Sequence, residues 1–280
     1  MVVQHNMQAA NANRMLGITT NSQAKSTEKL SSGYKINRAA DDAAGLAISE
    51  KMRSQIRGLD KASTNAQDGI SVVQTAEGAL NEVHSMLQRM NELATQAAND
   101  TNTSQDRSQI QLELNQLTSE IDRVQATTQF NTMNLLDGQF TGKSLQVGAL
   151  SGQTIQISIG NMDSKSLDIC GEGFGTAKGS GLSVSTNALA GKAMDAYQKA
   201  IDRVSTQRAE LGAVQNRLEH TIANLDNVSE NTQSAESRIR DTDMAKEMVQ
   251  WSKNNILQQA GQSMLAQANQ SNQGVLSLLQ

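Results

Sequence analysis

The chain has 280 residues, no proline, one cysteine, only 2% aromatic residues and a formal net charge of −4. So little aromatic area is unusual for a compact globular core, whereas the abundant Ala, Leu, Ile, Val and Met are residues that pack helix on helix. Basic and acidic residues are interspersed, which excludes the basic face needed to bind nucleic acid or an anionic membrane. We therefore expect long helices.

Several other classes of site are also not predicted. The three histidines lie far apart and Cys170 has no second cysteine, so we expect neither a zinc site, nor a disulfide within the chain, nor any cofactor. No stretch approaches the ~20 apolar residues of a transmembrane helix, so we expect no membrane insertion. The first residues lack a cationic region followed by an apolar run, so we expect no Sec-type signal, and composition alone favours a cytoplasmic protein.

Residues 1 to about 30 predict a polar amphipathic helix, because Met7, Met15 and Ile18 are thinly spread among Gln and Asn. Such a helix is marginal on its own. Gly33 follows as a turn signal, since glycine adopts positive φ without strain. We expect helix to resume over about 46–58. The adjacent carboxylates Asp41 and Asp42 precede it, where negative charge favours a helix start, so we do not expect them to act as catalytic or metal-binding groups.

A second helix is predicted over about 66–99. Its apolar residues alternate in steps of three and four, the spacing of a coiled-coil seam. They are Val73, Ala76, Leu80, Val83, Leu87, Met90, Ala94 and Ala97. A second row widens this apolar face and consists of Val72, Ala79, Met86 and Leu93. The width predicts contact with more than one partner helix.

The next helix is predicted over about 104–128, where Thr103 and Asp106 match a capping box. The loop before it is short, so this helix should run antiparallel to the seam helix. The apolar period then changes to two on either side of Ser151-Gly152, which predicts a β-hairpin within the region 139–186. The glycine-rich run 171–181 lacks the order of a phosphate-binding loop and predicts a flexible surface turn.

A long helix over about 187–232 repeats the three-four pattern and should be the second partner of the seam helix. Because it comes from the far end of the sequence, the helical domain must be discontinuous. A break near residues 237–243 precedes the last amphipathic helix, which carries the single tryptophan, Trp251.

Motifs near both ends of the chain resemble bacterial flagellins. The amino-terminal match is Leu30-Ser-Ser-Gly-x-x-Ile36-Asn37-x-Ala39-x-Asp41-Asp42-Ala43-Ala44-Gly45, continued by Asn65-Ala-x-Asp68-Gly69-Ile70-Ser71. The carboxy-terminal match includes Gly212-Ala-x-Gln215-Asn216-Arg217 and Ser237-Arg238-Ile239-x-Asp241-x-Asp243. The resemblance covers roughly residues 20–160 and 190–280. Many fixed positions at fixed spacing make it far more specific than one short motif.

The resemblance implies a minimal flagellin without the variable outer domains. The expected fold is mainly α, a long discontinuous coiled-coil helical rod built from both chain ends, with a small β-hairpin region. Residues 1–45 plus 238–280 would form the innermost terminal-helix coiled-coil domain of the filament core, and 46–237 the helical rod domain. Assembly and core packing are expected to involve Leu30, Ile36, Val73, Leu80, Leu87, Leu114, Ile121, Leu211, Leu218, Trp251, Leu257, Leu265, Leu276 and Leu279.

The implied function is that of a structural subunit that self-assembles into the flagellar filament for swimming motility. The resemblance also implies export by the flagellar type III system to an extracellular filament, with an export chaperone and a cap protein as further partners. Because the terminal helices are weak as isolated segments, we expect their folding to be coupled to polymerisation.

The resemblance further implies that Toll-like receptor 5 is a host partner. The run Gln88-Arg89-Met90-Asn91-Glu92-Leu93-Ala94 is similar to the segment which that receptor recognises in flagellins. The implied receptor-binding residues are Gln88, Arg89, Glu92, Leu93, Gln96 and Glu113. We expect Leu93 to remain partly exposed at the edge of the seam. Asn91 replaces a second arginine and Gln280 a basic last residue, so the strength of signalling stays open.

Three other functions are weighed against the filament subunit. A hook–filament junction protein would share the terminal helices, but the dense match at both ends and the short middle favour the main subunit. A secreted adhesin or binding module would need a more elaborate exposed domain than the residues 139–186 provide. Enzymatic activity is not expected, since no nucleophile, base or metal constellation occurs at a meaningful spacing.

Overall fold

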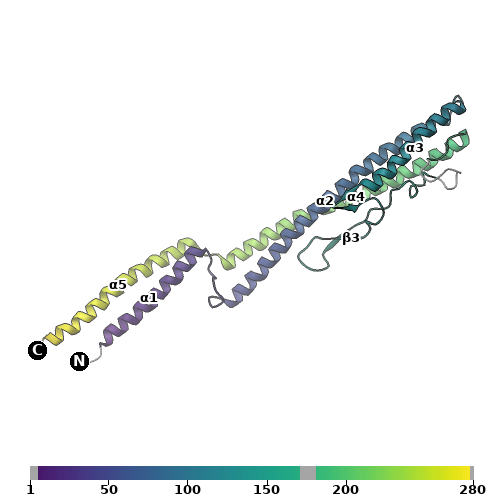
Figure 1. Cartoon of the computed structure of the whole chain (residues 1–280). Coiled ribbons are helices and arrows are strands. Elements are labelled where there is room, and N and C mark those ends of the chain that lie inside the picture. The colour runs from purple at the N-terminus through teal and green to yellow at the C-terminus, as the bar shows by residue number, and fades with distance from the viewer. Residues whose placement is uncertain (1–5, 171–180, 278–280) are drawn as a thin grey trace. The chain divides into compact units, whose positions relative to one another are not determined.

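The computed structural model describes residues 6–170 and 181–277, with side chains as far as residue 270. The elements, labelled in Figure 1, follow in the order α1 (Met7–Ser32), α2 (Ala43–Ala97), α3 (Ser104–Thr127), β1 (Gln129–Phe130), β2 (Met133–Asn134), β3 (Lys143–Gln146), β4 (Thr154–Ile157), α4 (Asn187–Arg240) and α5 (Met244–Ser277). The mainly α fold with a small β-hairpin is confirmed. The glycine-rich run predicted as a flexible turn lies almost wholly outside the described residues.

The chain forms two compact units. We call Arg57–Ser229 the central unit, and Met1–Ile56 together with Glu230–Gln280 the terminal unit. The helices α2 and α4 each contribute residues to both units. The terminal unit is therefore discontinuous and combines segments from both chain ends, whereas the central unit is one continuous stretch.

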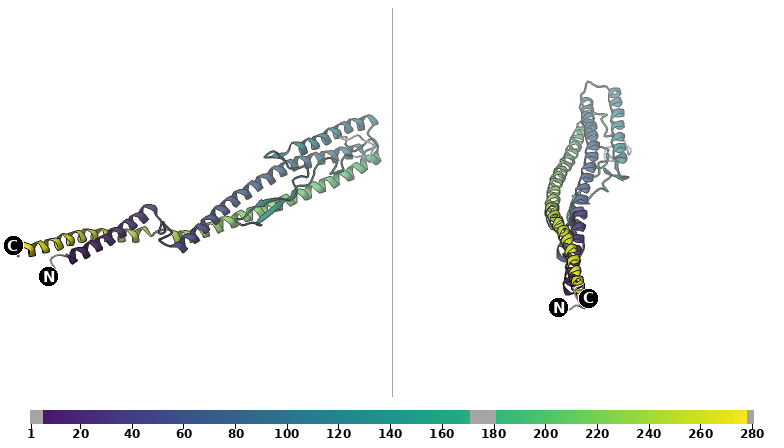
Figure 2. Two further views of the ribbon diagram at one scale, coloured as in Figure 1. Left: turned by 60° about the horizontal axis from the view of Figure 1, so that its bottom comes forward. Right: turned by 90° about the vertical axis from the view of Figure 1, so that its left-hand side faces the viewer.

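Three long helices lie side by side in the central unit, as both views of Figure 2 show. The predicted seam of α2 is fully covered: Val73, Leu80, Leu87 and Met90 all have 0% of their surface exposed. Leu114 on α3 and Leu211 on α4 belong to the same core. The predicted contact of α2 with two partner helices is thus confirmed, and it explains why its apolar face is wider than a two-helix seam requires.

Helix α2 runs antiparallel to both α3 and α4. Near the start of the central part of α2, the Ser63 hydroxyl lies 3.2 Å from a carboxylate oxygen of Asp226 on α4. Near its end, the Arg107 Nε on α3 donates to the carbonyl of Ala97 at 3.0 Å. The predicted capping box of α3 is present, because Thr103 and Asp106 each accept a hydrogen bond from the other's backbone N–H. Helix α3 therefore reverses direction in a short turn after α2 and packs against it.

Helix α2 is longer than its sequence indicates. The sequence predicts separate helices over 46–58 and 66–99, but the structure has one helix from Ala43 to Ala97. The intervening run Ser63-Thr64-Asn65 has weak helix propensity, yet Leu59 and Ala62 just before it pack on Leu225 of α4. Tertiary burial thus outweighs weak local propensity. Helix α4 extends beyond the predicted residue 232, to Arg240, and Glu236 in this added part pairs with Arg53 of α2 at 3.4 Å.

The predicted β-hairpin consists of antiparallel β3 and β4, which pair from Lys143 with Ile157 to Gln146 with Thr154. Gly152 takes φ +86 in the connecting turn, a conformation that favours glycine. Ile155 and Ile157 alternate inward and are 3% and 1% exposed, so the hairpin packs on the helices. A shorter antiparallel pair, β1 with β2, comes directly after α3 and is not predicted from the sequence.

The terminal unit contains the antiparallel helices α1 and α5, which lie side by side in Figures 1 and 2. The Asn6 amide donates to the Ala268 carbonyl at 3.0 Å, and the Trp251 indole donates to the Thr27 hydroxyl at 3.1 Å. The two hydrogen bonds join opposite ends of the helix pair. Gly33 caps α1 with φ +77, as the turn signal predicts.

The two linkers of the terminal unit are bonded to each other. Lys35 donates its N–H to the Arg240 carbonyl at 2.7 Å, and Thr242 donates to the Gly33 carbonyl at 2.9 Å. The Arg240 guanidinium also lies 4.9 Å from the Tyr34 ring centroid, a cation–π distance. These contacts tie the segment after α1 to the segment before α5.

The paired carboxylates before α2 have structural roles. The Asp42 carboxylate accepts the N–H of Gly45 at 2.9 Å at the start of the helix. The Asp41 carboxylate accepts the N–H groups of Arg38 and Asn37. These hydrogen bonds, that from Arg38 foremost, hold the pKa of Asp41 below its usual value.

Candidate assembly and receptor surfaces

Most of the exposed large apolar side chains of the described chain belong to the terminal unit. They are Met7, Met15, Ile18, Ile48, Met244, Met248, Val249, Ile256, Leu257 and Met264, with exposures from 47% to 72%. Among the described residues of this unit, Ile36 is the one apolar side chain that is fully buried. The terminal unit therefore leaves most of its apolar surface in contact with water.

The contact between α1 and α5 is built largely from polar and small groups. Ser26 on α1 and Asn254 on α5 are 3% and 5% exposed, and Gly261 faces the side chain of Leu16. The Asn254 amide nitrogen is buried without a hydrogen-bond partner. A contact of this kind buries little apolar area, so it supplies little of the driving force that normally holds two helices together.

The exposed apolar residues of α5 form two rows. Val249 and Ile256 are seven residues apart, and so are Leu257 and Met264, which is the heptad spacing of a helix seam. At 3.6 residues per turn, the row of Val249 and Ile256 lies on the side opposite Asn254 and hence away from α1. Its members are 71% and 66% exposed. Helix α5 thus presents helix-packing rows that no other part of the described chain covers.

The residues predicted for assembly and core packing fall into three groups. Those in the central unit are all buried: Val73, Leu80, Leu87, Leu114, Ile121, Leu211 and Leu218. In the terminal unit, Ile36 is buried, Leu257 is exposed, and Leu30, Trp251 and Leu265 are half-buried. The side chains of Leu276 and Leu279 lie outside the described residues. Sequence periodicity alone does not separate the buried residues of the central unit from the exposed and half-buried ones of the terminal unit, because both follow helical spacing.

The predicted receptor residues lie where α2 passes α3. The Arg89 guanidinium donates to Glu113 of α3 through Nε at 3.0 Å and to Glu92 through Nη1 at 3.2 Å. The hydrogen bond to Glu113, followed by that to Glu92, raises the pKa of Arg89. Gln88 and Gln96 are exposed on the same helix. About half of the Arg89 and Glu113 side chains is exposed, 51% and 46%, so the pair is ordered yet accessible.

Leu93 does not lie where it is expected. It is 2% exposed and belongs to the central core. The reason is the packing of α3, the first predicted partner, on α2. Leu93 lies one helical turn after Arg89, which bonds to Glu113 of α3, so Leu93 is on the side of α2 that faces α3. The exposed apolar side chain beside Glu113 is instead Leu112 on α3, which is 56% exposed. Helical spacing could have indicated this, because Leu112 lies about 200° around the helix from both Ile110 and Leu114 and therefore points away from the core.

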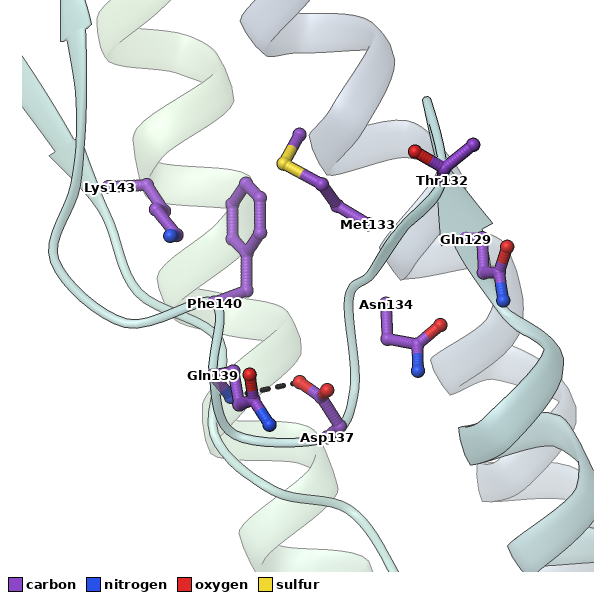
Figure 3. Close-up of a pocket in the computed structure, with 8 residues that line it drawn as sticks. All are labelled: Gln129, Thr132, Met133, Asn134, Asp137, Gln139, Phe140 and Lys143. Atoms are coloured by element: carbon purple, nitrogen blue, oxygen red, sulfur yellow. Dashed lines mark hydrogen bonds between the residues drawn. The ribbon is translucent and has the colours of Figure 1, made fainter.

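A cavity of about 470 Å³ lies among the loops after α3 (Figure 3). Its lining combines one carboxylate, Asp137, and one ammonium group, Lys143, with amide side chains, Met133 and the edge of Phe140. The Asp137 carboxylate accepts the N–H of Gln139 at 2.9 Å, the bond dashed in Figure 3. This carboxylate is therefore used to hold its own turn.

In residues 6–170 and 181–277, no group of three His, Cys, Asp or Glu side chains is arranged to hold a metal ion. Over the same residues, no helix combines the length and apolar content that crossing a membrane requires.

Comparisons with known proteins agree with the sequence motifs. The N-terminal helical region of bacterial flagellin matches residues 3–141, and the C-terminal helical region of bacterial flagellin matches residues 194–279. The chain is 56% identical over 279 residues to a flagellin of Halalkalibacterium halodurans and 49% identical over 303 residues to a flagellin of Bacillus subtilis. Each of these alignments covers 100% of both proteins.

A solved structure supports the fold. The structure of a putative flagellar hook-associated protein from Vibrio parahaemolyticus has a TM-score of 0.58 to this chain at 14% identity. The match covers 72% of this chain and 100% of the other. At that identity the likeness shows the fold alone.

The buried helical core and the uncovered apolar rows define a structural protein that associates through helices. More particularly, the chain belongs to the bacterial flagellin family. It is a structural subunit of the extracellular flagellar filament and serves motility. The predicted family, filament role and location are thereby confirmed.

Proposed function

We propose that this flagellin polymerises chiefly through its terminal unit, and that α1 and α5 become stably folded only in the filament. The division predicted from the sequence, with 1–45 plus 238–280 as the innermost domain and 46–237 as the outer helical domain, is part of this proposal. The proposal rests on one observation. Ten large apolar side chains of the terminal unit are exposed, whereas Ile36 is the one fully buried apolar side chain among the described residues of that unit.

The size of the effect is consistent with polymerisation. Full burial of one Ile, Leu, Val or Met side chain is worth about 1.5–3 kcal/mol, so Ile256, two-thirds exposed, has about 1–2 kcal/mol still to gain. Association costs at least about 4 kcal/mol in lost freedom of motion, so several such residues must be buried together. The two rows of α5 and the exposed residues of α1 provide them. A head-to-tail contact whose rotation does not close then extends into a helical filament.

The test is elongation of filament seeds by purified subunits, observed by electron microscopy. Ile256→Ser should raise the subunit concentration needed for growth by about tenfold, because 1.4 kcal/mol corresponds to a factor of ten. Met133→Ser is the matched control, since Met133 is 43% exposed in the central unit, and it should elongate seeds like the parent. Equal growth of the Ile256→Ser subunit and the parent would contradict the proposal.

A hook–filament junction protein is the alternative weighed against the main filament subunit from the sequence, because it would share the terminal helices. The same seeding experiment separates the two. A main filament subunit should extend seeds into long filaments, whereas a junction protein should add at most a short segment and stop.

The exposed rows of α5 also suggest how the subunit is kept unassembled before export. We propose that the export chaperone covers the row of Val249 and Ile256, and that the cap protein guides these residues onto the growing end. Binding of purified chaperone should weaken in Ile256→Ser and stay unchanged in Met133→Ser. Equal affinity of the chaperone for both variants would place its site elsewhere.

We further propose that Toll-like receptor 5 contacts the surface of Gln88, Arg89, Glu92, Gln96 and Glu113. The sequence resemblance and the exposure of these residues support this. Arg89 is held by two carboxylates, so binding it costs less side-chain entropy than binding a free arginine. Leu112 replaces Leu93 as the apolar contact of this proposal.

The receptor proposal is tested with paired arginine variants. Arg89→Ala should weaken binding of the receptor ectodomain about 30-fold, the effect of a hot-spot residue worth about 2 kcal/mol. Arg123→Ala is the matched control, because Arg123 forms an ion pair with Glu120 on α3 and is 61% exposed. Surface plasmon resonance measures both affinities. Equal losses in the two variants would indicate a general charge effect and contradict the assignment.

A further inference from the structure

The exposed methionines of the described chain are concentrated in the terminal unit. Met7 and Met15 lie on α1, and Met244, Met248 and Met264 lie on α5. Their exposures run from 47% for Met244 to 72% for Met7. We call these five residues the terminal methionines.

Methionines of the central unit are placed differently. Met90 and Met162 are 0% and 6% exposed and pack in the core. Within the described part of this unit, Met133 is the methionine with an exposed side chain, at 43%, and it lines the cavity of Figure 3. The accessible thioether groups therefore coincide with the surface assigned to polymerisation.

We propose that the terminal methionines are a site of oxidation by peroxides in the unassembled subunit, and that their oxidation blocks addition to the filament. This inference rests on the proposed role of the terminal unit. A thioether sulfur attacks one oxygen of hydrogen peroxide, an S–O bond forms and the O–O bond breaks. The sulfur is oxidised to the sulfoxide, and the peroxide is reduced to water.

The sulfoxide interferes with assembly because it changes an apolar group into a strong hydrogen-bond acceptor. Met264 shares a row with Leu257, and Met15 lies three residues from exposed Ile18, so each sulfoxide would enter an apolar contact. A polar oxygen buried there without a donor is unfavourable. The folded central unit should be unaffected, because its core methionines are covered.

Assembly should in turn protect the same residues. Once a neighbouring copy covers the apolar rows, the sulfur atoms are no longer accessible to peroxide. Sensitivity is thus a property of free subunits and of the filament end. A filament already formed should retain reduced terminal methionines under a treatment that oxidises free subunits.

The test compares oxidation with growth. Free subunits are treated with hydrogen peroxide, sulfoxides are mapped by mass spectrometry of peptides, and elongation of seeds is measured for treated and untreated protein. The main variant combines Met7→Leu, Met15→Leu, Met244→Leu, Met248→Leu and Met264→Leu. The control is Met133→Leu, which leaves the terminal methionines intact.

Peroxide treatment should slow seed elongation about tenfold or more for both the parent and Met133→Leu. This is the effect expected when each contact buries one polar group without a hydrogen-bond partner. The fivefold variant should show the same elongation before and after treatment. Methionine sulfoxide reductases should restore the treated parent, a readout that does not depend on how well the variant assembles. Normal elongation by parent protein with oxidised terminal methionines, or no restoration by the reductases, would overturn the inference.

Failure of this inference is distinguishable from failure of the assembly proposal. If Ile256→Ser is defective but the oxidised parent grows normally, only the oxidation inference is wrong. If Ile256→Ser grows like the parent, the assignment of polymerisation to the α5 rows is wrong.

Discussion

The burial of Leu93 leads to a prediction that separates stability from receptor contact. Leu93 is 2% exposed in the core between α2 and α3, whereas Leu112, beside Glu113, is 56% exposed. We predict that Leu93→Ala destabilises the central unit and that Leu112→Ala does not. The two substitutions remove the same three carbon atoms, so any difference between them reports on the surroundings.

The magnitude follows from the burial. Three buried carbon groups at about 0.8 kcal/mol each give roughly 2.4 kcal/mol in lost transfer free energy. Part of the resulting cavity remains open in a packed helical core, which brings the expected loss to about 3 kcal/mol, within the range known for buried leucines. Leu112→Ala should change the free energy of unfolding by less than about 0.5 kcal/mol, as exposed positions usually do.

Urea unfolding followed by circular dichroism at 222 nm measures both values. With a slope of about 2 kcal/mol per molar urea, Leu93→Ala should lower the midpoint by about 1.5 M. Receptor affinity, measured on folded protein, should fall in Leu112→Ala and be retained in Leu93→Ala. An unchanged midpoint in Leu93→Ala would refute the assignment of Leu93 to the core.

Three further predictions concern single groups. Burial raises the pKa of the Tyr197 phenol above its usual 10.0, so above pH 10 the phenol ionises in the unfolded state before it does in the folded state. Above that pH, the free energy of unfolding should therefore fall by about 1.4 kcal/mol per pH unit more in the parent than in Tyr197→Phe. Equal slopes of stability against pH in the two proteins would contradict this. The hydrogen bond from Thr103 lowers the pKa of Asp106 below 3.8, so the α3 cap should persist above that pH and weaken as pH falls through the lowered pKa. The variant Thr103→Ala should show faster amide hydrogen exchange at the start of α3 already at neutral pH, and an unchanged exchange rate would speak against the cap. Gly33→Ala should lower the stability of the terminal unit by about 1 kcal/mol, because Gly33 has φ +77 and an added Cβ would meet no neighbouring atom, which leaves backbone strain as the cost. An unchanged thermal unfolding temperature would show that the linker relaxes.

Local chemistry accounts for the parts of the fold that were predicted correctly. The cap at Thr103, the turns at Gly33 and Gly152 and the seam of α2 each depend on a few neighbouring residues. Their spacing alone determines which side of a helix or strand is apolar. The width of the apolar face of α2 also indicates correctly that it needs two partners.

Long-range packing decides the parts that differ. The run Ser63-Thr64-Asn65 has weak helix propensity, yet the contacts of Leu59 and Ala62 with α4 help keep α2 continuous. The strands β1 and β2 have two residues each, too few to show an alternating pattern in the sequence.

For the candidate sites, the sequence by itself determined the family, the helical spacing and the residue types available to each surface. Only the tertiary structure decided which apolar rows are covered: the row of Leu93 by α3, but not the row of Val249 and Ile256 on α5. The physical reason is that helical periodicity fixes the direction of a side chain relative to its own helix axis. Whether water or another helix lies in that direction depends on segments far away in the sequence.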